Sequence, residues 1–96
     1  MLKVGKYKVK VIYDTYTQGG GLYAGLECLD GEPYADLTTN LIGTGYLASE
    51  GCGFVKMGDT WGTNFVEWLE QNGVAERTGR IGFSGFNTYA EMKFNK

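Results

Sequence analysis

The apolar side chains between residues 60 and 74 recur with the period of a helix. They stand at positions i, i+4, i+7 and i+8, as Trp61, Phe65, Trp68 and Leu69. This spacing places all four on one side of an α-helix. Gly73 suits the left-handed residue that follows a helix, and Val74 then falls where it contacts Leu69. We predict one helix over about residues 60–72.

Several residues could be the N-cap of this helix. Asn64 and Glu67 have the spacing of a capping box. Other residues that suit an N-cap are Asp59, Thr60 and Thr63. Gly62 weakens the first turn, and we place the start near Thr60. Two indoles on one short helix need cover from water, so we expect a sheet to cover both rings and leave no cavity for chemistry.

Before the helix, the pattern changes to the two-residue alternation of strands. Residues 6–13 form a half-buried strand whose inner side chains are Tyr7, Val9, Val11 and Tyr13. Gly5 indicates a bulge or the beginning of this strand. Residues 22–28 form a second strand, and the glycine-rich residues 17–21 between the two are predicted to be a hairpin tip. A third strand follows Pro33, with an inner set of Ala35, Leu37, Thr39 and Leu41.

The rest of the chain adds shorter elements. Residues 54–57 are predicted to form a strand that leads to the helix, and residues 75–79 a polar connection. Two short strands then meet near residues 85–88, and the last has one apolar side made of Ala90, Met92 and Phe94. The predicted fold class is α+β, a mostly antiparallel sheet of about five or six short strands with a single helix packed on it.

Composition agrees with this small strand-rich fold. The chain has 96 residues with 16 glycines and one proline, which suits short strands and tight turns. We treat residues 1–96 as a single domain, because this length buries one core. No apolar run approaches the roughly 18 residues that cross a membrane. The first residues lack the apolar stretch of a signal peptide, so we expect a cytoplasmic protein.

Few groups suited to catalysis are present. Histidine is absent, which removes the commonest general base and metal ligand. Cys28 and Cys52 are interpreted as free thiols, and two cysteines alone do not complete a zinc site. The glycine pairs at 43–45, 51–53 and 82–85 lack the Lys-Ser or Lys-Thr of a phosphate-binding loop. We therefore expect no enzyme activity, no metal and no cofactor.

Charge is distributed unevenly along the chain. Residues 1–10 carry four lysines, and residues 77–96 are also basic. Between them, residues 11–76 hold ten acidic residues against Lys56 alone. If the first and last strands are neighbours, the domain has two faces of opposite charge, which would steer it toward a charged macromolecular partner. A solvated surface that keeps a small domain soluble is the alternative interpretation.

Several short motifs from residue 35 onward recur in one known family. They are Asp36-Leu-Thr-Thr-Asn-Leu41, Phe54-Val-Lys-Met57, Glu70-Gln-Asn-Gly-Val74, Thr78-Gly79, Ser84-Gly-Phe86, Thr88-Tyr89 and Phe94. In their order and spacing, the chain resembles the domain-of-unknown-function family 4313, small uncharacterised proteins of bacterial mobile elements and phages. It departs from the family pattern before the helix, at residues 58–62, and at Tyr89-Ala90. The resemblance implies an accessory protein of a mobile element and supplies no catalytic residue.

Our first hypothesis is a non-enzymatic protein that binds and inhibits a host macromolecular target, above all a defence complex of the CRISPR or restriction type. Such a complex contains a nuclease with a basic groove for nucleic acid. The candidate binding residues are Glu27, Asp30, Glu32 and Asp36, as a partial mimic of nucleic-acid phosphates. The oligomeric state is left open, and no membrane partner is expected.

The alternative hypothesis is a single-stranded nucleic-acid-binding module. Its contacts would be the N-terminal Lys6, Lys8 and Lys10 with the strand tyrosines Tyr7, Tyr13, Tyr23, Tyr34 and Tyr89. The net charge of −2 argues against it, because phosphate binders usually present a basic face.

A small enzyme that uses a carboxylate pair is the third hypothesis. It requires a pocket that raises the pKa of one carboxyl group, whereas the pairs Glu67/Glu70 and Asp30/Glu32 are predicted to be solvated.

Overall fold

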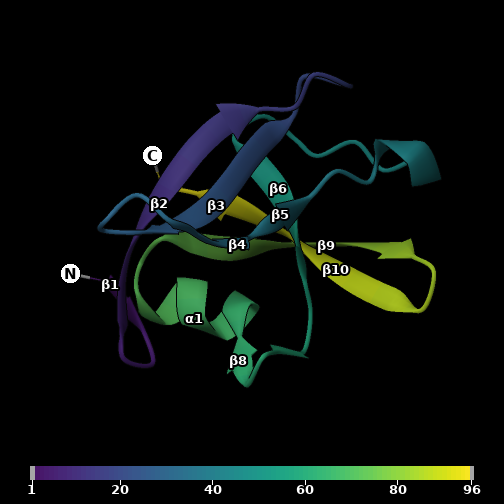
Figure 1. Cartoon of the computed structure of the whole chain (residues 1–96). Helices are drawn as coiled ribbons and strands as arrows, with labels where there is room; N and C mark the ends of the chain where they lie inside the picture. Colours follow the sequence, from purple (N-terminus) through teal and green to yellow (C-terminus); the bar gives the residue numbers. More distant parts are fainter. Residues whose placement is uncertain (1, 96) are drawn as a thin grey trace.

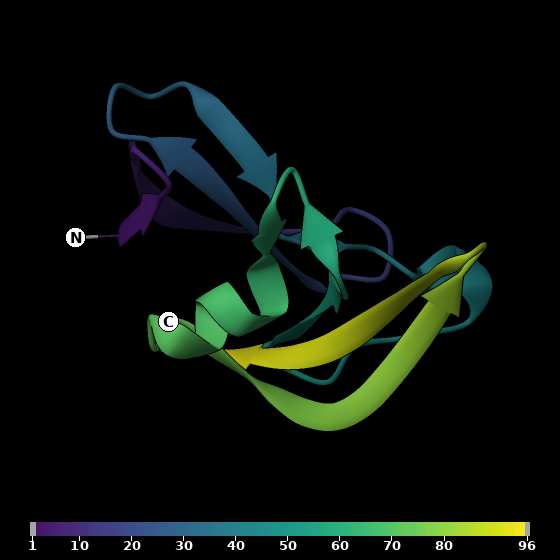
Figure 2. The ribbon, with the colours of Figure 1, turned by 90° about the horizontal axis from the view of Figure 1, so that it is seen from below.

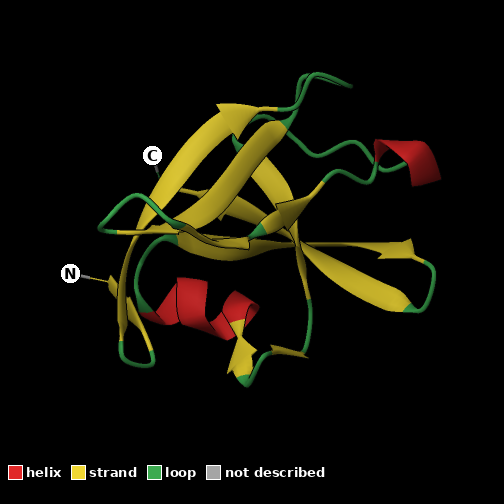
Figure 3. Cartoon of the chain, viewed as in Figure 1, coloured by secondary structure: helices red, strands yellow, loops and turns green. Residues whose placement is uncertain are grey.

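The computed structural model describes residues 2–95. In that part of the chain, ten strands form two four-stranded sheets and one small hairpin, all with antiparallel pairing, around one α-helix (Figure 1). The strands are β1 (Leu2–Val4), β2 (Tyr7–Thr15), β3 (Leu22–Cys28), β4 (Pro33–Asp36), β5 (Thr38–Thr39), β6 (Cys52–Lys56), β7 (Asp59–Thr60), β8 (Thr63–Asn64), β9 (Ala75–Ser84) and β10 (Asn87–Phe94). The helix α1 spans Phe65–Gln71, and a 3-10 turn η1 spans Ile42–Thr44. The α+β prediction is confirmed, with more strands than the five or six expected (Figure 3).

The first sheet has the order β1-β2-β3-β4. Val4 pairs with Tyr7, so Gly5 lies in a two-residue turn with a φ of +57°. Such turns need left-handed residues, which glycine supplies without strain. Gly5 therefore marks a hairpin turn and not a bulge or a strand beginning. The second predicted hairpin is confirmed, since Thr15 pairs with Leu22 across the loop at 16–21.

The chain passes from the first sheet to the second between β4 and β5. Leu37 still donates its backbone N–H to Ala24 of β3, at 2.9 Å. Thr38, the next residue, already pairs with Val55 of β6 in the second sheet. This change shifts the alternation by one residue, so Thr38 is buried and Thr39 is exposed. The prediction that Thr39 points inward was wrong for this reason.

The helix begins at Phe65, five residues later than predicted. Residues 59–64 instead form the β7–β8 hairpin, with Trp61 and Gly62 at its tip. Both tip residues have a positive φ, +51° for Trp61 and +83° for Gly62, as two-residue hairpin turns require. Asn64 is the N-cap, and its side chain accepts a hydrogen bond from the Glu67 N–H at 3.2 Å. Asn64 is thus the one of the four candidate caps that the helix uses, and the predicted start near Thr60 was wrong because residues 59–64 form the β7–β8 hairpin.

The end of the helix agrees with the sequence prediction. Gly73 has a left-handed φ of +69°. Its N–H donates to Glu70 O, and the Val74 N–H donates to Leu69 O at 2.9 Å. These two bonds satisfy carbonyl groups that a helix end otherwise leaves unpaired.

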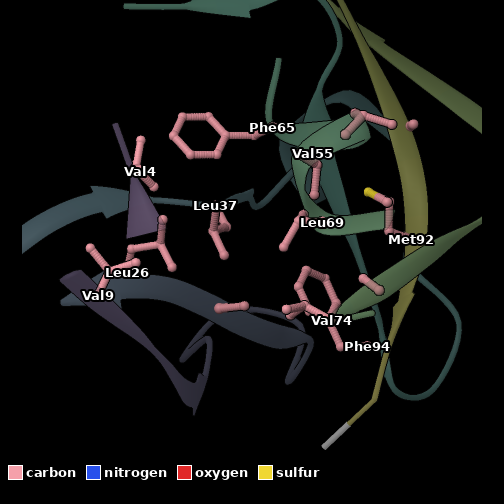
Figure 4. Close-up of a cluster of buried hydrophobic side chains, with 14 residues drawn as sticks. Val4, Val9, Leu26, Leu37, Val55, Phe65, Leu69, Val74, Met92 and Phe94 are labelled. Carbon is pink, nitrogen blue, oxygen red and sulfur yellow. The ribbon is translucent and has the colours of Figure 1, made fainter. Parts of the chain in front are cut away.

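The main core lies between the two sheets and the helix (Figure 4). From the helix, Phe65, Val66 and Leu69 are buried there. They contribute to one cluster with Val55 of β6 and Met92 of β10. The predicted apolar side of β10 is confirmed, because Ala90, Met92 and Phe94 are all buried.

The two tryptophans have different environments. Trp68 packs against the core, and its indole N–H donates to the Lys3 carbonyl at 2.9 Å. Trp61 is 80% exposed. The expectation that a sheet covers both rings is therefore correct for Trp68 and wrong for Trp61, because Trp61 belongs to a hairpin tip and not to the helix.

The second sheet has the order β5-β6-β10-β9, with β9 at one edge. Residues 75–79, predicted as a polar connection, are the first half of this strand. A bulge interrupts the pairing, since Ile81 lies opposite Ala90 while Arg77 lies opposite Met92. Gly79, within the bulge, has a φ of +101°. The strand bends strongly there (Figure 2).

Candidate functional site

The four predicted binding carboxylates lie on one hairpin, β3–β4 with its turn. Glu27 is on β3, Asp36 ends β4, and Asp30 and Glu32 belong to the turn. We call these four residues the acidic hairpin. The turn is well defined, because the Gly31 N–H donates to Cys28 O at 2.9 Å and Asp30 Oδ1 accepts from the Glu32 N–H at 3.1 Å. All three residues of the turn, 30–32, are exposed.

Two of these carboxylates have partners within the sheet. Lys10 Nζ lies 3.3 Å from Glu27 Oε1, across the β2–β3 pair. The Tyr23 hydroxyl donates to Asp36 Oδ1 at 2.6 Å. This hydrogen bond raises the pKa of Tyr23 to about 12, with smaller contributions from burial and from the Asp36 charge. The proton therefore stays on the Tyr23 hydroxyl at neutral pH.

Gly25 makes room for the contact between Tyr23 and Asp36. It lies opposite Asp36 in the β3–β4 pairing and two residues after Tyr23 on β3. A Cβ atom at this position would collide with the Tyr23 hydroxyl. The missing side chain lets the phenol ring lie across Gly25 toward the carboxylate.

A surface hollow of about 420 Å³ brings part of the acidic hairpin together with aromatic side chains. Its lining includes Ile12, Tyr23, Glu27, Tyr34, Asp36 and Trp61. We call it the Trp61 hollow. Asp30 and Glu32 are not part of this lining. The hollow thus combines two carboxylates, two phenol rings and an indole.

Trp61 lines this hollow from the tip of the β7–β8 hairpin. A non-glycine residue with a φ of +51° is uncommon and strained. Sequence reasoning missed the position because Trp61 and Phe65 also fit a helical spacing. The signal that marks it is Thr60-Trp-Gly-Thr63, a glycine-containing pair between β-branched residues.

A second hollow, of about 320 Å³, lies between the β2–β3 loop and residues 47–51. Glycines make up much of its lining, and Glu50 is the one titratable residue in it. Acid–base catalysis by paired carboxylates needs a second carboxyl group, which this lining lacks. The lining also contains no aromatic side chain, unlike that of the Trp61 hollow.

The most buried carboxylate is Glu91 on β10, which sequence reasoning did not single out. Its oxygens accept hydrogen bonds from Thr78 Oγ1 at 2.6 Å, Arg80 Nη1 at 2.8 Å and the Ser49 N–H at 3.0 Å. The β9 bulge directs Thr78 and Arg80 toward it. Burial raises the pKa of Glu91, but these hydrogen bonds and the Arg80 charge outweigh burial and hold it below its usual range.

The Glu91 cluster joins three segments of the chain. Arg80 also donates to the Leu47 carbonyl at 3.3 Å, and its guanidinium lies 5.9 Å from the Phe54 ring centre. Both carboxylate oxygens of Glu91 are already hydrogen-bonded. The hydrogen bonds from the Ser49 N–H to Glu91 and from Arg80 to the Leu47 carbonyl therefore hold residues 47–49 against the second sheet.

Only some of the side chains that the nucleic-acid hypothesis requires are exposed to solvent. Tyr89 is buried, and the Tyr13 ring packs edge-on against Phe94 at 6.1 Å. Tyr23 and Tyr34 line the Trp61 hollow, and Tyr7 is 49% exposed. Tyr7 is therefore the tyrosine of this set that stays available for stacking on a base. It lies near two paired lysines, because Lys3 is directly opposite Lys8 in the β1–β2 pair.

The condition for the opposite-charge arrangement, that the first and last strands are neighbours in a sheet, is not met. β1 and β2 belong to the first sheet, while β10 pairs with β6 and β9 in the second. The basic ends of the chain are therefore not neighbouring strands. Instead, the N-terminal lysines share a sheet with the acidic hairpin, as the Lys10–Glu27 contact shows.

The two cysteines are not paired with each other: Cys28 is partly buried, Cys52 is buried, and both are free thiols. No three His, Cys, Asp or Glu side chains within residues 2–95 are grouped to hold a metal ion. The same residues include no helix with the length and apolar character to span a membrane.

Comparison with known protein families matches residues 10–96 to the family described as Domain of unknown function (DUF4313). No curated protein matches the chain. No solved structure matches it either.

Proposed function

The chain belongs to the DUF4313 family, and from this membership and its own surface we propose that it is a small non-enzymatic binding protein of a phage or other mobile genetic element. It acts in the cytoplasm of the host. It binds and inhibits a macromolecular defence complex, such as a CRISPR or restriction nuclease. The acidic hairpin presents negative charge to the basic groove in which such a nuclease holds nucleic acid.

The observation that carries this proposal is that Glu27 and Asp36 of the acidic hairpin line the same hollow as the exposed Trp61 and the half-buried Tyr34. Interface centres are enriched in aromatic residues, which supply contact area at small entropic cost. Trp61 and Tyr34 provide such area beside Glu27 and Asp36. The carboxylates complement the charge of a basic protein surface, and the aromatic rings beside them add apolar contact area.

The arrangement supports binding better than catalysis. Asp36 accepts from Tyr23, Glu27 lies beside Lys10, and the Glu91 oxygens are occupied by Thr78, Arg80 and Ser49. General acid catalysis needs a carboxyl group with a raised pKa. The pKa of Glu91, the most buried carboxylate, is instead lowered.

A plasmid interference assay tests the proposed function. Cells that carry a CRISPR or restriction nuclease receive a plasmid which that nuclease cuts, with or without expression of this chain. A panel of nuclease types is screened. We expect transformation to recover by at least tenfold for one type, and to fall again with the variant Glu27→Lys, Asp30→Lys, Glu32→Lys, Asp36→Lys. No recovery with any nuclease would contradict inhibition of such defence systems.

The second candidate function is single-stranded nucleic-acid binding by the β1–β2 hairpin. The observation that favours it is the pairing of Lys3 with Lys8 next to the exposed Tyr7, whose ring lies 5.6 Å from Lys6 Nζ. Titration of labelled oligonucleotides separates the two candidates. This second function requires binding that weakens steeply as salt rises, because lysines displace counterions from phosphates.

A further inference from the structure

We propose that the Trp61 hollow receives an arginine side chain of the protein to which this chain binds. This inference rests on the proposed function and adds a defined site and a ligand chemistry to it. The guanidinium would stack on the Trp61 indole and donate hydrogen bonds to Glu27 and Asp36.

The aromatic part of the site is Trp61. The ring is 80% exposed and stands at the wall of a hollow. Within residues 2–95 it has no ring partner, whereas Trp68 packs edge-on against Phe65 at 6.1 Å. The hairpin turn therefore holds the largest apolar side chain of the protein ready for an outside contact. The face of an indole attracts cations more strongly than phenol or benzene rings do.

The carboxylate part of the site consists of Asp36 and Glu27. The Tyr23 hydroxyl donates a hydrogen bond to Asp36 and so orients this carboxylate. Only Asp36 Oδ1 is used in this bond. The Lys10 side chain beside Glu27 is 53% exposed, and solvent screens exposed ion pairs of this kind so that they contribute little to stability. An incoming cation can therefore displace Lys10 at small cost.

The combination of groups favours a guanidinium over other cations. A guanidinium is planar, so it stacks on an indole and still donates from its edge to carboxylates. An ammonium is more strongly hydrated and lacks this geometry. A divalent metal ion needs more ligands than this hollow supplies, since no three metal-ligating side chains in the described part of the chain are grouped. The site thus matches an arginine on a basic surface.

Nuclear magnetic resonance on the ¹⁵N-labelled chain tests this site without knowledge of the target. The probe is a blocked peptide, acetyl-Gly-Arg-Gly-amide, and its control contains citrulline, a neutral analogue of arginine. We expect a saturable shift of the Trp61 indole N–H resonance with the arginine peptide. The Trp68 indole should stay in place, because its N–H is bonded to Lys3 O. Phenylalanine in place of Trp61 assigns the two resonances.

Variants connect the shift to the proposed contacts. Trp61→Asn removes the ring, and asparagine tolerates a positive φ, so the hairpin is retained. The backbone amide resonances of residues 34 and 36, which line the hollow, report binding in both variants. Trp61→Asn and Asp36→Asn should each weaken peptide binding by about fivefold or more, because each removes one of the contacts to the guanidinium. Asp30→Asn, on the same hairpin but outside the hollow, is the matched control and should change the affinity by less than about twofold.

The outcomes separate this inference from the proposed function. A Trp61 indole that does not move at millimolar peptide, or that moves equally with citrulline, overturns the arginine site. This holds even if the chain inhibits a nuclease in cells. A saturable, arginine-dependent shift of the Trp61 indole that weakens in Asp36→Asn and not in Asp30→Asn supports the site, whether or not a nuclease of the panel is inhibited.

Discussion

At the scale of single residues, Glu91 shows how a buried charge is retained in a small protein. A carboxylate taken out of water destabilises the fold unless its oxygens find donors. Thr78, Arg80 and Ser49 supply three of them. The alternation along β10 places Glu91 on the outer side, opposite the inward-facing Ala90 and Met92, so this role could not be predicted from the sequence. That outer side is covered by the 47–49 segment.

We predict that Glu91→Gln lowers the free energy of unfolding by about 2 kcal/mol at pH 7, since the amide cannot accept all three bonds. The folded-state pKa of Glu91 lies below its usual value. Its stabilising effect is therefore complete above about pH 4.3, the usual pKa of glutamate, and is lost as pH falls through the folded-state pKa. The difference between wild type and variant should shrink on acidification. Urea unfolding at several pH values measures it, and a constant difference would contradict this role.

At the scale of elements, the sequence predicted best where local chemistry decides the conformation. The helix end at Gly73 and Val74 follows from the need for a left-handed residue. Its beginning was misplaced because Trp61 satisfies a helical spacing and a hairpin tip equally well. The first half of β9 was missed because an edge strand with exposed polar residues lacks the alternation of a half-buried one.

A substitution at each candidate start of the helix tests where α1 begins. Asn64→Ala should reduce stability by about 1 kcal/mol, because it removes the bond to the Glu67 N–H. Thr60→Ala, in β7, is the control and should cost less than about 0.5 kcal/mol. Thermal and urea unfolding of both variants measure the two losses of stability. The reverse ranking would place the helix start at Thr60.

At the scale of the whole molecule, the acidic hairpin and the basic β1–β2 hairpin share one sheet. From the sequence, the four carboxylates could be grouped because they lie within ten residues around a predicted turn. Trp61 could not be added to them, since it comes from a separate hairpin and only the folded chain brings it to Glu27 and Asp36. The candidate site was therefore predictable in its charge and not in its aromatic part.

The central claim is that this surface binds a basic protein target. Calorimetric titration of the purified chain with the nuclease identified in the interference assay tests it most directly. Reversal of Glu27, Asp30, Glu32 and Asp36 to lysine should weaken binding by well over tenfold, whereas reversal of the exposed Glu50, Glu67 and Glu76 should change it by less than about threefold. Equal affinity of the wild type and the acidic-hairpin variant would contradict the claim.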